Sequence, residues 1–202
     1  MSRNAGGGGP PSSNWSSGGQ FTAGQTAAPQ TGLVQLLTTA VQALQSGDLA
    51  AAEQPATEAV RMAPTNPDCH LIMGTLRQNQ GQLHDAERHY AEALRLKPGN
   101  LRALTNLGML QLNAGKGEDA VGSLEKAVAL DPSALDARHF LARAYGHCER
   151  YEEALEQFDY VNERVPDNTD ILSGYAMALE ALGRAEEATA MLQRVEGLQL
   201  AK

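Results

Sequence analysis

Aromatic residues and cysteines are scarce in this chain of 202 residues. Phe, Trp and Tyr make up only 4% of it, which argues against large aromatic pockets and leaves small aliphatic side chains to build one modest folded domain. The two cysteines, Cys69 and Cys148, lie far apart and form no CxxC pattern. We therefore expect free thiols in a reducing compartment rather than a disulfide framework.

The chain also has few positively charged residues and no long apolar run. The formal net charge is −8, and Arg3 is the only charged residue among the first 32, so the rest of the chain is still more acidic. Such a body repels a phosphate backbone, which argues against nucleic-acid binding. The most apolar segment, Leu33–Leu44, is too short to cross a bilayer, and no continuous apolar stretch follows Arg3 as in a signal peptide. We predict a cytoplasmic protein without membrane insertion.

The first 32 residues are rich in Gly, Ser and Pro and cannot bury enough apolar surface to offset the entropy of ordering them. We predict a disordered tail over residues 1–32. Trp15 and Phe21 are its aromatic residues, and two interpretations of them stay open. The tail is either a passive linker, or its segment NWSSGGQF folds back as a tethered ligand of the folded part.

An internal repeat fills the remainder of the chain. Pro64, Pro98, Pro132 and Pro166 are each separated by 34 residues, which divides it into unit one (33–66), unit two (67–100), unit three (101–134), unit four (135–168) and unit five (169–202). The eighth position of every unit is Gly or Ala and the twentieth is always Ala, so two helices can approach closely there. Glycine at the fifteenth position of four units indicates a turn between antiparallel helices, and the proline ends the second helix.

This pattern resembles the tetratricopeptide repeat, which has Leu-Gly and Tyr in its first helix and Ala, Phe or Tyr, Ala and Pro in its second. The segments LIMGTLRQNQGQLHDAERHYAEALRLKP (71–98) and LTNLGMLQLNAGKGEDAVGSLEKAVALDP (104–132) match at most of these positions. The resemblance implies an all-α fold, a right-handed α-solenoid of five helix-turn-helix repeats. Unit one departs from the pattern with Pro55 inside its second helix, and unit four has Glu149 in place of the turn glycine. We expect unit one to be the loosest hairpin.

No catalytic, cofactor or metal site is predicted. The segment NAGKGED around Lys116 lacks the first glycine and the Ser or Thr of a phosphate-binding loop. His84 and His89 are five residues apart on one helix and point in different directions, unlike paired metal ligands. The carboxylates Glu152, Glu153 and Glu156 fit a solvated helix face. We expect no enzyme activity and no cofactor.

A surface for protein partners remains. In the resembled family, the first helices of successive hairpins line a concave groove that holds a peptide or a helix. The corresponding positions here are largely apolar: Val34, Leu37, Val41, Leu44, Leu71, Ile72, Thr75, Arg102, Asn106, Met109, Leu112, Asn113, His139, Phe140 and Arg143, with His147 and Met177 at further such positions. The family's grip on a C-terminal carboxylate is disfavoured, because Leu71 and Thr75 stand where Lys and Asn are needed.

The sequence thus predicts an adaptor or scaffold that binds a peptide or helix of a partner in this groove. The alternative is a non-catalytic docking arm of a larger transferase-type enzyme or multi-subunit assembly. A second contact surface is predicted at the last helix, where the sequence offers no further helix to cover an apolar edge of Met191, Leu192, Val195 and Leu198. A second copy of the chain would fit that edge and form a homo-oligomer.

Overall fold

The computed structural model describes residues 27–200, and every regular element in this range is an α-helix. The helices are α1 (Ala27–Gln45), α2 (Leu49–Met62), α3 (Pro67–Asn79), α4 (Leu83–Leu96), α5 (Leu101–Asn113), α6 (Gly117–Leu130), α7 (Leu135–His147), α8 (Tyr151–Asn162), α9 (Thr169–Ala181) and α10 (Ala185–Leu200). Each predicted unit corresponds to one pair of them, although α1 begins before residue 33. The predicted all-α solenoid of five helix hairpins is confirmed. None of the described helices is both long and apolar enough to cross a membrane.

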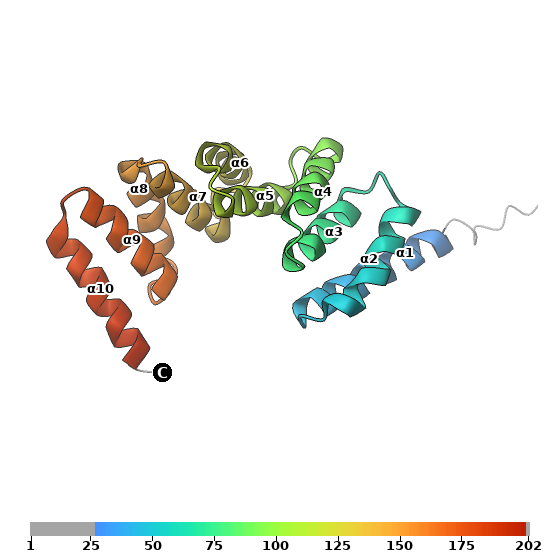
Figure 1. The fold of residues 1–202 in the computed structure, drawn as a ribbon, viewed down its shortest axis with the longest axis horizontal. Helices are drawn as coiled ribbons and strands as arrows, with labels where there is room; N and C mark the ends of the chain where they lie inside the picture. The colour runs from blue at the N-terminus through green and yellow to red at the C-terminus, as the bar shows by residue number, and fades with distance from the viewer. Residues whose placement is uncertain (1–26, 201–202) are drawn as a thin grey trace, which may run out of the picture.

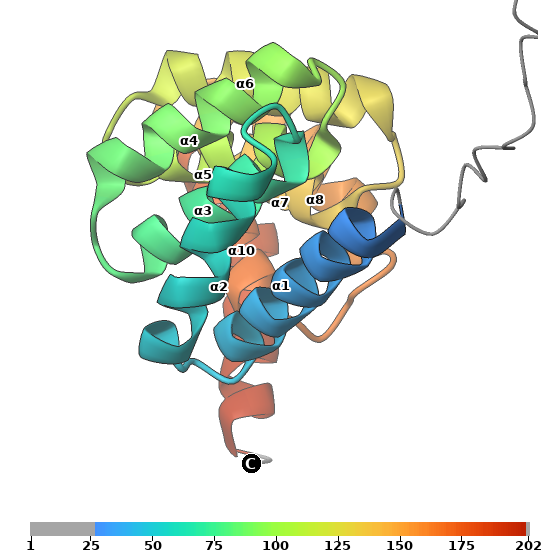
Figure 2. The same ribbon diagram turned by 90° about the vertical axis from the view of Figure 1, so that its right-hand side faces the viewer.

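The five hairpins follow one another along an arch (Figure 1). Helices α4, α6 and α8 lie on its outer side, whereas α3, α5 and α7 lie toward its inner side. Each helix contacts its neighbours in the chain, and contacts also join successive first helices such as α5 and α7. Figure 2 looks along the arch from the end where α1 and α2 lie, with the later hairpins behind them.

The turn inside each hairpin needs one residue in the left-handed backbone region. Gly47, Gly81, Gly115 and Gly183 have φ of 74–75°, a conformation that costs glycine nothing because it has no Cβ. In unit four this position is Glu149, which adopts φ 60°. The turn geometry is therefore retained even where the residue is unfavourable.

Close approach of the two helices in a hairpin depends on the small eighth residue. A Cβ on Gly74 would lie 2.7 Å from the ring of Tyr90, and one on Gly108 would lie 2.4 Å from Cγ of Leu124. Tyr90 and Leu124 are fully buried large side chains that fill the space the glycines leave. The alanines at the twentieth position, such as Ala86 and Ala120, are buried in the same cores. The spacing of small residues thus sets the distance between the helices.

Unit one differs from the others in two respects. Its first helix begins at Ala27, inside the segment 1–32 that the sequence analysis assigned to the tail, so the helical part starts earlier than predicted. Its second helix continues through Pro55, which is buried and cannot donate the backbone hydrogen bond expected at that position. The predicted tail residues 1–26, with Trp15 and Phe21, lie outside the described residues.

Candidate functional site

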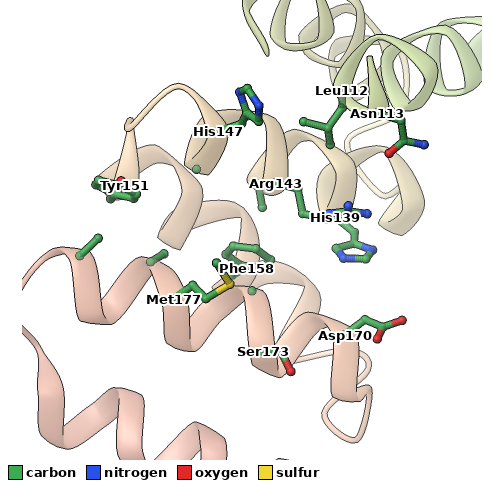
Figure 3. Close-up of a pocket in the computed structure, with 15 residues that line it drawn as sticks. Leu112, Asn113, His139, Arg143, His147, Tyr151, Phe158, Asp170, Ser173 and Met177 are labelled. Atoms are coloured by element: carbon green, nitrogen blue, oxygen red, sulfur yellow. The ribbon is translucent and has the colours of Figure 1, made fainter. Parts of the chain in front are cut away.

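A groove of ≈ 760 Å³ lies between α7 and α9, with α8 behind it and the end of α5 at one side (Figure 3). It is lined by Leu112, Asn113, His139, Ala142, Arg143, Gly146, His147, Tyr151, Phe158, Asp170, Ser173, Gly174, Met177, Ala178 and Ala181. In Figure 3, Phe158 lies between the two walls, His139 and Asp170 are at one end, and Tyr151 is at the other. The lining therefore comes from units three, four and five.

The groove is open because both walls carry small residues. Ala142 and Gly146 are one helical turn apart on α7, and Gly174 and Ala178 are one turn apart on α9. Gly174 also lets α9 approach the floor, since a Cβ there would lie 2.7 Å from Cζ of Phe158. The small residues leave space between the two walls, although Phe158 at its base is itself only 2% exposed.

Aromatic rings form the floor and one end of the groove. The ring of Phe158 stacks on Tyr175 at 6.0 Å between centroids and lies 6.5 Å from the ring of His139. His139 also stacks against Phe140 at 5.4 Å. Phe158 and Tyr175 belong to the hydrophobic core, so these rings fix the shape of the groove.

His139 is the chemically distinctive residue of this site. Its Nε2 atom is shielded from solvent and has no hydrogen-bond partner in the described part of the chain. Burial lowers the pKa of His139, and the neighbouring Arg143 lowers it further, while Asp170 and Asp136 act in the opposite sense. His139 is therefore neutral at pH 7, and a buried polar atom without a partner is a point where a bound group can form a hydrogen bond.

The basic and acidic residue types of the groove are unequally distributed between its walls. His139, Arg143 and His147 recur every four residues along one face of α7, whereas Asp170 is on α9. Arg143 is exposed, and its guanidinium carbon lies 5.8 Å from the centroid of the Phe140 ring. The arrangement can hold an apolar side chain against Met177 and orient it by polar contacts along α7.

The structure brings together four of the predicted groove residues, Leu112, Asn113, His139 and Arg143. His147 and Met177 line the same groove, and Met177 is 70% exposed. Phe140 stands beside it, stacked on His139 and partly buried against the core.

The other predicted groove residues lie outside this groove. Leu71 is only 6% exposed and packs in the core with Tyr90 and Leu110, so it is not available to a partner. The amide nitrogen of Asn106 donates to Thr75 Oγ1 at 3.4 Å, which joins α5 to α3. The remainder are distributed along the first helices of units one to three, exposed at Val34 and Arg102 and partly buried at Leu37, Val41, Leu44, Ile72 and Met109.

The sequence analysis missed several lining residues. Asp170, Ser173 and Gly174 occupy the second, fifth and sixth positions of unit five, which are groove positions in every unit, so the register alone could have identified them. Tyr151 and Phe158 come from α8, a second helix, and no first-helix register would have found them.

The predicted edge on α10 is only partly exposed. Leu192 is 40% exposed, and Met191 and Leu198 are partly buried. Val195 is buried at 8% exposure, because it occupies the inward twenty-seventh position, which is also buried in the other units, for example at Ala93 and Val161. Val195 therefore does not belong to an exposed edge.

Residues 27–200 contain no group of three or more His, Cys, Asp or Glu side chains that could hold a metal ion. Cys69 and Cys148 are free thiols. Burial raises the pKa of Cys69 to about 11, which makes it a poor nucleophile at neutral pH.

A family model described as "Tetratricopeptide repeat" matches residues 31–198. No curated protein matches the chain significantly. Among solved structures, the fold is similar to "MamA 41-end from Desulfovibrio magneticus RS-1" (TM-score 0.74, 20% identity, 85% of this chain and 97% of that one). It is also similar to MamA of AMB-1 (TM-score 0.73, 20% identity, 85% and 99%). At this identity the likeness concerns the fold alone.

Proposed function

The chain belongs to the tetratricopeptide-repeat family, and from this premise we propose that it is a protein-interaction adaptor whose groove between α7 and α9 binds a segment of a partner protein. The proposal places the binding site in units three to five. It is a binding function without catalysis, exercised in the cytoplasm. The repeat fold supports it, since such repeats present concave surfaces to other proteins.

The observation that carries the proposal is the combination of an exposed methionine in a groove with small walls and a buried polar atom without a partner. Met177 is 70% exposed beside the ring of Phe158, and Nε2 of His139 lacks a hydrogen bond at the end of the same groove. A partner's aliphatic or aromatic side chain against Met177 would bury the exposed surface of this methionine at about 25 cal/mol per Å² before ordering costs. A polar group of the partner next to this side chain would form the missing hydrogen bond with Nε2 of His139 and would contact Arg143.

The test replaces the exposed methionine. Met177→Asp should weaken partner binding by about tenfold or more, because a fully buried methionine contributes about 1.5–3 kcal/mol and a buried carboxylate is unfavourable. Peptides selected by display against the unchanged protein would be titrated against both proteins by calorimetry.

Leu130→Asp is the matched control, because Leu130 is 51% exposed at the end of α6 and lies outside the groove. It should leave binding unchanged, and both variants should keep the helical circular dichroism signal. Equal affinities for the Met177→Asp variant and the unchanged protein would show that the groove is not the binding site.

A further inference from the structure

Arg143 lines the groove and has no charged partner in the described part of its own chain. Within residues 27–200 its guanidinium forms no hydrogen bond and no ion pair, and the guanidinium carbon lies 5.8 Å from the centroid of the Phe140 ring. Except for Arg102, every other arginine of this range donates to a carboxylate or to a backbone carbonyl, as Arg150 does to Glu153 at 2.9 Å. The guanidinium of Arg143 is therefore free to bind a carboxylate from outside.

His139 precedes Arg143 by one helical turn on the same face of α7. Its imidazole forms no hydrogen bond within residues 27–200, and Nε2 is shielded from solvent. Asn113 of α5 and Phe158 of α8, which line the groove beside it, do not titrate. In Figure 3, Asn113, Arg143 and His139 lie on the same side of the groove, near the end of α5. An amide, a guanidinium and an imidazole are therefore available to one bound group.

These three groups favour a carboxylate over a cationic or an apolar group. An arginine side chain only donates hydrogen bonds, the amide nitrogen of Asn113 donates as well, and a protonated imidazole donates from both nitrogens. The acidic residue that lines the groove, Asp170, is on the other wall, α9. Met177, which is 70% exposed on α9, offers an apolar contact to the rest of a bound segment. An acidic side chain close to an apolar one in the partner's sequence therefore matches the groove in charge and in polarity.

The N-terminal segment of this chain has no acidic side chain to offer. Residues 1–32 include no Asp or Glu, and their one charged residue is Arg3. This composition favours a partner protein, rather than a tethered segment of the same chain, as the source of the carboxylate.

We propose, on the premise that the groove binds a partner, that the bound segment places a carboxylate between Arg143 and His139 and that His139 takes up a proton as the segment binds. The carboxylate accepts hydrogen bonds from the guanidinium and from an N–H of the imidazolium. The proton comes from the solvent and returns to it when the segment dissociates. The affinity for an acidic segment is therefore higher in mild acid than at neutral pH.

The direction of the effect follows from the pKa of His139 in the two states. In the free protein, burial lowers this pKa most and Arg143 lowers it further, against the opposing effects of Asp170 and Asp136. In the complex, a carboxylate at hydrogen-bond distance favours the charged imidazolium and raises the pKa of His139 above its value in the free protein. The affinity therefore increases as the pH falls through the value of the complex, and it levels off below the value of the free protein.

Peptide display on the full chain tests the carboxylate. Two libraries are selected in parallel, one with a fixed aspartate in an otherwise random sequence and one with asparagine at that position. The strongest Asp peptide should bind about tenfold more tightly than its Asn counterpart, because it alone forms charge-assisted hydrogen bonds. Arg143→Gln should remove this difference, whereas Arg102→Gln, at the other unpaired arginine and outside the groove, should retain it.

Calorimetry of the Asp peptide tests the proton. Titrations at pH 6.5 in PIPES and in Bis-Tris, whose heats of ionisation differ, should show a net uptake of protons on binding. Between pH 7.5 and pH 5.0 the affinity should rise about five- to tenfold, as expected for a displacement of one pKa unit. His139→Asn should abolish both effects, and His84→Asn, at an exposed position on α4, should leave them unchanged.

Equal affinities for the two peptides, an undiminished preference for the Asp peptide in Arg143→Gln, or binding without proton uptake would each overturn this inference. Met177→Asp separates such a failure from a failure of the proposed function. If that variant still loses the peptides, the groove is the binding site and its ligand has another chemistry. If it binds them unchanged, the groove is not the binding site.

Discussion

Glu149 is the residue in the described chain least suited to its backbone conformation. It adopts φ 60° at the turn position that four other units give to glycine. For a residue with a Cβ, the left-handed region costs about 1–2 kcal/mol. Glu149 is exposed in the turn before α8, so its side chain gains little burial in return.

We predict that Glu149→Gly raises the free energy of unfolding by about 1 kcal/mol, because it removes this strain. Urea denaturation monitored by circular dichroism measures the change. The reciprocal variant Gly115→Glu has open space around it and φ 74°, so it should lose a similar amount. An unchanged midpoint for Glu149→Gly would show that the turn in unit four is not strained.

At the scale of the element, the first helices of the hairpins differ in how their N-termini are capped. The side chains of Asn66, Asn100 and Asn168 accept backbone hydrogen bonds at the starts of α3, α5 and α9. The equivalent residue before α7 is Ala134, which has a similar extended backbone but no side chain that can accept. One of the two helices that form the groove walls thus begins without a cap.

We predict that Ala134→Asn stabilises the protein by about 1 kcal/mol, the usual contribution of such a cap. Thermal unfolding followed at 222 nm provides the measurement. Ala129→Asn adds the same side chain at an exposed position inside α6 and should give no gain. Equal melting temperatures for the Ala134→Asn variant and the unchanged protein would contradict the prediction.

The order and pairing of the helices could be predicted from the sequence, because the 34-residue register places a small residue, a turn and a proline in each unit. The start of α1 could not. Ala27 and Ala28 are good helix formers that extend α1 beyond the repeat, and the register carries no information outside its own period.

At the scale of the whole molecule, the register predicted which side chains face inward but not where space remains between them. Leu71 lies in a core cluster with Tyr90 and Leu110 as well as several alanines, and it is enclosed there. His139 faces Gly174 and Ala178, and there a gap stays open as a groove. The difference depends on the volumes of side chains from three helices together, which a single helix pattern does not contain.

The exposed leucines of α10 form a second candidate contact surface, and its role concerns the oligomeric state of the whole molecule. Leu192 is 40% exposed and Leu198 is partly exposed, and the two leucines flank the buried Val195 on opposite sides. We predict that two copies associate through this surface, and that Leu192→Glu with Leu198→Glu reduces the mass measured by light scattering to that of a monomer. Leu83→Glu, at a 46% exposed leucine on α4, is the control and should not change the mass. A monomer at every concentration of the unchanged protein would refute the prediction.

Helices contact only those one or two places away in the chain, so the hairpins are connected mechanically in series. Bending at one junction is then independent of bending at the others. A segment bound along the groove would contact α5, α7 and α9 at once, and would lock the two junctions between units three, four and five into a rigid block. The junction between units one and two is outside this block and would retain its compliance. A bound partner would therefore rigidify units three to five, whereas unit one could still change its orientation relative to unit two.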